Sequence, residues 1–135
     1  MRPPLLDTHI WIWYLGDQTK LTWAELSGLD ALDFENRPFI SDFSLWEIAT
    51  LISIKRLTLD RPLDRWLSIA ARPASVRILT VSVSVAIELA ELPDTFHRDP
   101  ADRAIVATAR AHRLLVLTRD HKIIDSSLVE LWAPE

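Results

Sequence analysis

Residues 99–120, with the sequence DPADRAIVATARAHRLLVLTRD, contain the pattern that decides the fold. Asp99 suits the N-cap of a helix and Pro100 suits its first turn, so the segment predicts a helix that runs to about His112. The apolar run that follows, residues 114–117, has the length of a short buried strand and ends at a polar triplet. A helix that leads directly into a buried strand is typical of a parallel sheet.

The same alternation of strands and helices extends outward over the rest of the chain. The other predicted strands are residues 4–6, 38–40, 76–81 and 128–132. The other predicted helices are residues 9–15, 20–35, 41–54, 62–72 and 83–92. Gly16 is predicted to end the first helix in a left-handed conformation. We therefore expect a single α/β domain over residues 1–135, with a parallel β-sheet flanked by helices on both faces.

The composition excludes several classes of protein. Hydrophobic residues make up 49% and charged residues 25% of the chain, which favours a packed core over disorder. The chain has no cysteine, which excludes disulfides, thiolate zinc sites and iron–sulfur clusters. It has two glycines, too few for glycine-rich phosphate loops. It contains neither a membrane-spanning apolar run nor a signal-peptide pattern, so a cytoplasmic location without membrane attachment is expected.

The charge alone does not indicate a nucleic-acid binder. The formal net charge is −4, and a negative protein repels a phosphate backbone. Arginine outnumbers lysine by twelve to three, however, and arginine is the better partner for phosphate oxygens. Any nucleic-acid site must therefore depend on how the charges are arranged.

Acidic residues recur at the carboxyl ends of the predicted strands, where open parallel sheets bind their ligands. Asp7 and Asp120 each follow a strand directly, and Glu47 lies in the helix after another strand. Asp99 and Asp102 begin the helix that leads into the last of these strands. Carboxylates gathered without a cation repel one another, whereas a divalent ion stabilises them. Ligation by oxygen alone favours Mg²⁺ or Mn²⁺.

Each acid also has a purely structural interpretation. Ser44 and Glu47 match the S-x-x-E capping box, which would begin a helix at Ser44. Asp99 fits a helix N-cap, and Asp7 and Asp120 fit ordinary caps between strand and helix. Taken one at a time, these positions do not show whether an acid is a helix cap or a metal ligand.

The histidines and tryptophans offer weaker indications. The four histidines lack the spacing of a metal motif, although His97 and His121 lie closest to the acids and are candidates for substrate contact. Four tryptophans exceed the obvious needs of a small core and are predicted to face a partner: Trp11, Trp13, Trp23 and Trp66.

The order of the acidic segments is more specific than any one of them. The segments are Leu6-Asp7-Thr8, then SDFSLWEI at residues 41–48, then HRDPADR at residues 97–103, and finally LTRD at residues 117–120. This order resembles the PIN-domain ribonucleases, and in particular the VapC toxins of bacterial type II toxin–antitoxin systems. The resemblance covers nearly the whole chain.

The resemblance implies a metal-dependent endoribonuclease that hydrolyses RNA phosphodiester bonds with Mg²⁺ or Mn²⁺. The residues that match the family's metal-binding acidic quartet are Asp7, Glu47, Asp102 and Asp120. Asp99 belongs to the D-P-x-D-R form of the motif and shares the catalytic role in this interpretation. Thr118 resembles the hydroxyl residue that often precedes the last acid.

The resemblance also implies partners. We expect a VapB-like antitoxin that sends a basic side chain to the acids, an RNA substrate, and a homodimer or a hetero-oligomer with the antitoxin. The basic residues beside the acids are expected to hold the RNA backbone: Arg98, Arg103, Arg119 and Lys122.

Two alternatives belong to other functional classes. A receiver-like signalling domain also has magnesium-binding aspartates, but it usually carries adjacent acids after the first strand and a lysine after a late strand. Here Leu6 precedes Asp7 and Thr8 follows it, which departs from that pattern. A non-catalytic interaction module would use the acids as caps and the tryptophans for assembly.

Overall fold

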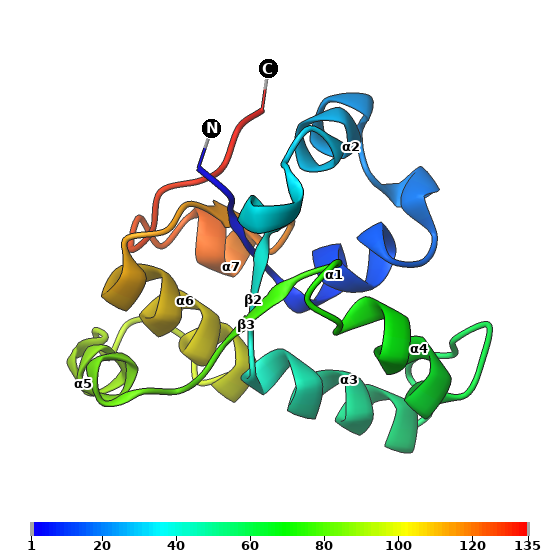
Figure 1. Ribbon diagram of the computed structural model, residues 1–135. Coiled ribbons are helices and arrows are strands. Elements are labelled where there is room, and N and C mark those ends of the chain that lie inside the picture. Colours follow the sequence, from blue (N-terminus) through cyan, green and yellow to red (C-terminus); the bar gives the residue numbers. More distant parts are fainter. Residues whose placement is uncertain (1, 135) are drawn as a thin grey trace.

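The computed structural model describes residues 2–134, which contain a four-stranded sheet surrounded by helices (Figure 1). The strands are β1 (Leu5–Leu6), β2 (Phe39–Ser41), β3 (Arg77–Leu79) and β4 (Val116–Leu117). They lie in the order β3-β2-β1-β4 and each neighbouring pair is parallel. The predicted α/β class is thus confirmed, and the carboxyl ends of the strands share one edge of the sheet.

Helices follow each strand and connect it to the next. They are α1 (Thr8–Tyr14), α2 (Trp23–Asp30), α3 (Phe43–Ser53), α4 (Leu63–Ala70), α5 (Val83–Glu91), α6 (Pro100–His112) and α7 (His121–Ile124). The helices predicted at residues 9–15, 41–54, 62–72, 83–92 and 99–112 are confirmed, with ends that differ by a few residues. Among the described helices, none is both long and apolar enough to cross a membrane.

Two predicted elements are wrong in their extent. The helix predicted over residues 20–35 is interrupted because Thr22 forms a capping box with Glu25, which begins α2 at Trp23. Short 3₁₀ turns lie on either side of α2, at Gln18–Lys20 and Phe34–Asn36. The strand predicted at residues 128–132 is reduced to one parallel bridge between Val116 and Leu131 in the described chain.

Gly16 has a role other than the predicted one. Neither glycine of the described chain has a positive φ, so Gly16 does not end α1 in a left-handed conformation. A Cβ atom at this position would lie 2.9 Å from the carbonyl oxygen of Ile12. The glycine is therefore needed for a close approach of the backbone.

Both faces of the sheet are covered by packed helices (Figure 1). In β1 the side chain of Leu6 packs with α1 and α4, while Leu5 packs with Ile105 of α6. In β4 the same alternation places Leu117 on the first face and Val116 on the second. Because both faces are buried at β1 and β4, these two strands are apolar throughout, whereas β2 ends in Ser41 and the less buried β3 begins at Arg77.

The tryptophans are more buried than predicted. Trp11 and Trp66 pack edge to face with ring centroids 5.1 Å apart, and the Trp11 indole donates to the carbonyl of Ala70 at 2.9 Å. The prediction that these two residues face a partner is wrong, because both side chains are buried and fill the core between α1 and α4. Trp23 is 81% exposed and Trp46 is 55% exposed.

Candidate active site

The five predicted acids line one cavity of about 360 Å³ at the carboxyl edge of the sheet. Its lining residues are Asp7, His9, Trp13, Glu47, Asp99, Asp102, Arg119 and Asp120. The fold therefore brings together every acid that the sequence analysis selected, from β1, α3, α6 and β4. His9 and the half-buried Trp13 were not predicted as lining residues, although their position in the first turns of α1, directly after Asp7, places them there.

Asp7 and Asp120 are joined through the hydroxyl group of Thr118. Thr118 Oγ1 donates to Asp7 Oδ2 at 2.6 Å and accepts from the backbone N–H of Asp120 at 2.9 Å. Asp7 Oδ1 accepts from the backbone N–H of Thr8 at 2.7 Å, so the residue also caps α1. Burial raises the pKa of Asp7, against the lowering effect of these hydrogen bonds.

Glu47 is not part of a capping box. The helix α3 begins at Phe43, and the hydroxyl of Ser44 shares a hydrogen bond with the Thr8 hydroxyl at 2.8 Å. Glu47 Oε1 is buried and has no hydrogen-bond partner within residues 2–134. Burial raises the pKa of Glu47, and the nearby charge of Asp7 adds to the effect. A buried carboxylate oxygen in this situation is strongly destabilising unless a proton or a cation reaches it.

Asp99 and Asp102 have different positions in α6. Asp99 is the N-cap, and its Oδ1 accepts from the backbone N–H of Asp102 at 3.1 Å. Asp102 is 8% exposed; burial, and after it the neighbouring carboxyl group of Asp120, raise its pKa to about 9. Asp120 caps α7 through a 2.9 Å hydrogen bond from the N–H of Lys122. When no cation is bound, this raised pKa favours the protonated form of Asp102 at neutral pH.

A histidine joins this group of acids. His97, Asp102 and Asp120 each offer a ligand atom, and the three atoms lie within 4.8 Å of one another. The loop that carries His97 is held by Arg103, whose Nη1 donates to the carbonyls of Phe96 and His97 at 3.2 Å each. From the sequence, His97 is a candidate for substrate contact only, because the path of the loop before α6 has no local signal.

Two of the four basic residues expected to hold RNA are engaged within the protein. Arg119 forms a two-pronged ion pair with Glu25 of α2, and Arg103 holds the loop before α6. Although burial opposes it, the pair with Arg119 lowers the pKa of Glu25. Both guanidinium groups hold segments around the cavity, and Arg119 also lines it, so their contact with an RNA backbone stays a prediction. Arg98 and Lys122 have exposed side chains.

The sequence pattern of the PIN domain family matches residues 5–126. The chain belongs to this family. It is 32% identical to Ribonuclease VapC22 of Mycobacterium tuberculosis over 123 residues, and this aligned region spans 91% of each chain. This family membership sets aside the receiver-like alternative.

Solved structures have the same fold. VapBC2 from Rickettsia felis, bound to a DNA fragment from their promoter, has a chain with a TM-score of 0.71 and 17% identity, covering 97% of this chain and 98% of that one. FitAcB from Neisseria gonorrhoeae has a chain with a TM-score of 0.67 and 24% identity, and the match covers 96% of each chain. At these identities the likeness concerns the fold of the PIN domain.

The acidic cavity of this PIN domain suits a divalent cation. Its donors are carboxylate oxygens with one adjacent imidazole, and the buried Oε1 of Glu47 has no protein partner in the described chain. Burial is the main cause of the raised pKa of Asp102, and the neighbouring carboxyl groups add to it, so a cation would stabilise the ionised form. Hard oxygen donors at this density fit Mg²⁺ or Mn²⁺.

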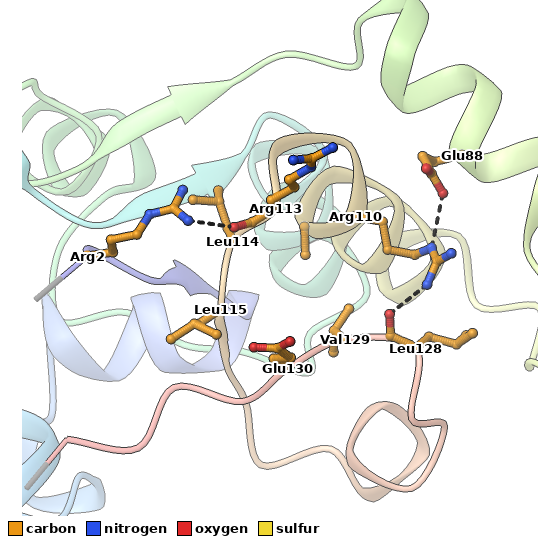
Figure 2. Close-up of a pocket in the computed structure, with 10 residues that line it drawn as sticks. Arg2, Glu88, Arg110, Arg113, Leu114, Leu115, Leu128, Val129 and Glu130 are labelled. Carbon is orange, nitrogen blue, oxygen red and sulfur yellow. Dashed lines mark hydrogen bonds and ion pairs between the residues drawn. The ribbon is translucent and has the colours of Figure 1, made fainter.

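A second cavity of about 500 Å³ lies at the opposite, amino end of β4 (Figure 2). Arginines surround it, but two of them are engaged: Arg2 Nη1 donates to the Arg113 carbonyl at 3.1 Å, and Arg110 bonds to Glu88 and to the Leu128 carbonyl. The cavity brings no group of acids together, and we do not assign the chemistry to it.

Proposed function

We propose that this PIN domain is a metal-dependent endoribonuclease of the VapC type. The observation that carries the proposal is the group of five acids around one cavity at the carboxyl edge of the sheet, in which Glu47 Oε1 is buried without a partner among residues 2–134. The similarity to Ribonuclease VapC22 supports RNA as the substrate. The acids alone would repel RNA, so the cation is what makes the cavity compatible with a phosphate group.

Asp7, Glu47, Asp102 and Asp120 would hold Mg²⁺ or Mn²⁺ in this proposal. The bound ion supplies a nucleophile at neutral pH by acidifying water, and it stabilises the charge that develops on the phosphate. All four acids line the same cavity. Asp7, Asp102 and Asp120 are proposed as direct ligands, and Glu47 would complete the site as a ligand or by orienting the attacking water.

The remaining residues prepare the site. Thr118 sets the orientation of Asp7 and the start of α7 through its two hydrogen bonds. Asp99 fixes the start of α6, and so the direction of Asp102, while its own side chain lines the cavity. The exposed Arg98 and Lys122 border the acids and are proposed to hold flanking RNA phosphates.

An antitoxin is the proposed protein partner. The complexes of VapBC2 and FitAcB have the same fold in one of their chains, and a VapB-like inhibitor would place a basic side chain among the acids. Trp23, with 81% of its surface exposed on α2, stays the predicted anchor for such a partner. A homodimer is proposed as the symmetric assembly.

The test is to incubate the purified chain with total cellular RNA, with and without Mn²⁺, and to sequence the new RNA ends. We expect defined new ends that depend on Mn²⁺ and are absent with Asp7→Asn, which keeps the shape of the side chain and removes its charge. Asp64→Asn, at an exposed acid of α4, is the matched control and should cleave like the wild type. Cleavage by Asp7→Asn at the wild-type rate would contradict the proposal.

A further inference from the structure

His97 is the one nitrogen donor in the group of three potential ligands found within residues 2–134. Its Nε2 atom lies 3.1 Å from Asp102 Oδ2, and the group's three ligand atoms lie within 4.8 Å of one another. Two ligands that each lie about 2.1 Å from one ion can be at most about 4.2 Å apart. The group therefore needs a movement of less than an ångström to close around a single ion.

His97 Nε2 has no other use in the described structure. The atom is buried, and despite its short distance to Asp102 it has no hydrogen bond of acceptable geometry with any described residue. Buried polar atoms are normally satisfied, and an exception needs a reason such as an ion. The same condition holds for Glu47 Oε1 across the cavity.

The surroundings hold the imidazole in this position. Phe96 is buried and meets the His97 ring edge to face at a centroid distance of 4.7 Å. Arg103 Nη1 binds the carbonyls of both residues, as described above. Packing against Phe96 and the guanidinium bound to its backbone therefore hold the imidazole beside the acids.

The histidine that lines the cavity is arranged differently from His97. His9 lines the cavity but lies against Trp13, with ring centroids 6.2 Å apart, and is outside the group of three ligand atoms. His121 directly follows Asp120, and its side chain is exposed. Among the described histidines, His97 alone combines a buried ring nitrogen with proximity to two of the acids.

We infer that His97 is a further metal ligand, with Asp102 and Asp120, and that its nitrogen makes the site prefer Mn²⁺ to Mg²⁺. Imidazole binds first-row transition ions better than it binds Mg²⁺, whereas carboxylates bind both. This inference rests on the proposed function, because it concerns the same cation. It adds one nitrogen ligand to the four carboxylate ligands proposed above.

The first experiment detects the nitrogen directly. Electron spin-echo envelope modulation of the Mn²⁺-loaded protein reports nitrogen-14 nuclei bound to the ion. We expect nitrogen modulation in the wild type, its loss in His97→Gln and in His97→Ala, and its retention in His121→Gln. Thermal unfolding in chelator checks that each variant is folded. Absence of nitrogen modulation in the wild type, or its persistence in a folded His97 variant, overturns the inference.

The second experiment measures selectivity by calorimetric titration with each ion. In His97→Gln we expect the affinity for Mn²⁺ to fall about tenfold and the affinity for Mg²⁺ to change much less. Equal losses for both ions overturn the preference. A protein that binds Mn²⁺ through oxygen alone and still cleaves RNA refutes the role of His97 and leaves the proposed function intact. A protein that neither binds these ions nor cleaves RNA refutes both.

Discussion

Thr118 shows how much of the site depends on one hydroxyl group. The residue is buried, donates to Asp7 at 2.6 Å and accepts from the backbone of Asp120 at 2.9 Å. It thereby fixes two acids that are 113 positions apart in the chain numbering, from Asp7 to Asp120. A group that orients the residues around an ion without binding it influences affinity almost as strongly as a ligand.

We expect Thr118→Val to lower Mn²⁺ affinity by about 10- to 100-fold, because Asp7 loses its donor while the volume of the side chain is kept. Thr118→Ser retains the hydroxyl and should restore most of the affinity. Calorimetric titration with Mn²⁺ measures both variants. Equal affinities of the valine and serine variants would show that the hydroxyl does not orient Asp7.

The raised pKa of Asp102 gives the metal-free protein a specific pH dependence. The folded protein keeps a proton on this group up to about pH 9, whereas the unfolded chain loses it near the ordinary value of 3.8. Between these values the folded state binds more protons, so the free energy of unfolding should decrease as the pH rises. The slope for one such group is at most about 1.4 kcal/mol per pH unit.

Urea unfolding in chelator at pH 5, 6, 7 and 8 measures this slope. Asp102→Asn should flatten it and raise stability near pH 8, whereas Asp64→Asn, at an exposed acid, should leave it as in the wild type. A wild-type stability that increases over this range would show that the folded protein does not keep a proton on Asp102.

At the scale of elements, the start of α6 gives two carboxylates different positions. Asp99 caps the helix through its bond to the N–H of Asp102, and Asp102 lies deeper, beside Asp120 and His97. The two acids are three positions apart, so the first turn of the helix turns both toward the cavity. Their individual roles follow from which of them the helix needs as its cap.

We expect Asp99→Ser to keep the helix and much of the RNA cleavage, because serine caps helices nearly as well as aspartate. Asp102→Ser should abolish cleavage, since a hydroxyl cannot replace an anionic ligand. Cleavage rates in Mn²⁺, with circular dichroism as the check on helix content, measure both. Equal losses of activity in the two variants would show that Asp99 also binds the ion.

At the scale of the whole molecule, a negative protein is proposed to act on a negative substrate. The net charge of −4 includes a concentration of acids in one cavity, which only a cation or a basic group can make attractive to RNA or to an inhibitor. The proposed antitoxin and the proposed ion would therefore bind to the same carboxylates. We expect each to weaken the binding of the other.

We expect expression of the chain alone to arrest growth, and coexpression of a short reading frame next to its gene to restore it. The dissociation constant of the purified complex should increase about tenfold with saturating Mg²⁺, because ion and basic side chain compete for the acids. NaCl at equal ionic strength is the control for general screening. Growth without arrest and a complex that does not respond to Mg²⁺ would contradict an antitoxin that occupies the site.

Much of this PIN domain follows from local features of its sequence. Apolar periodicity predicts the strands and most helices, and Asp7 and Asp120 follow strands directly, so the parallel arrangement alone brings them to one edge. The order of the acidic segments indicates the family. Helix caps such as Asp99 are also local, because their hydrogen bonds span three residues.

Other features were decided by contacts between residues far apart in the chain. The Ser44 hydroxyl bonds to Thr8 across 36 positions instead of forming the capping box with Glu47 that the local sequence also allows. Arg119 reaches Glu25 across 94 positions. The burial of Trp11 against Trp66 and the approach of His97 to Asp102 likewise depend on how helices and loops pack. Local sequence determines which conformation a segment prefers, whereas burial and the pairing of polar groups are settled only when the core excludes water from both partners.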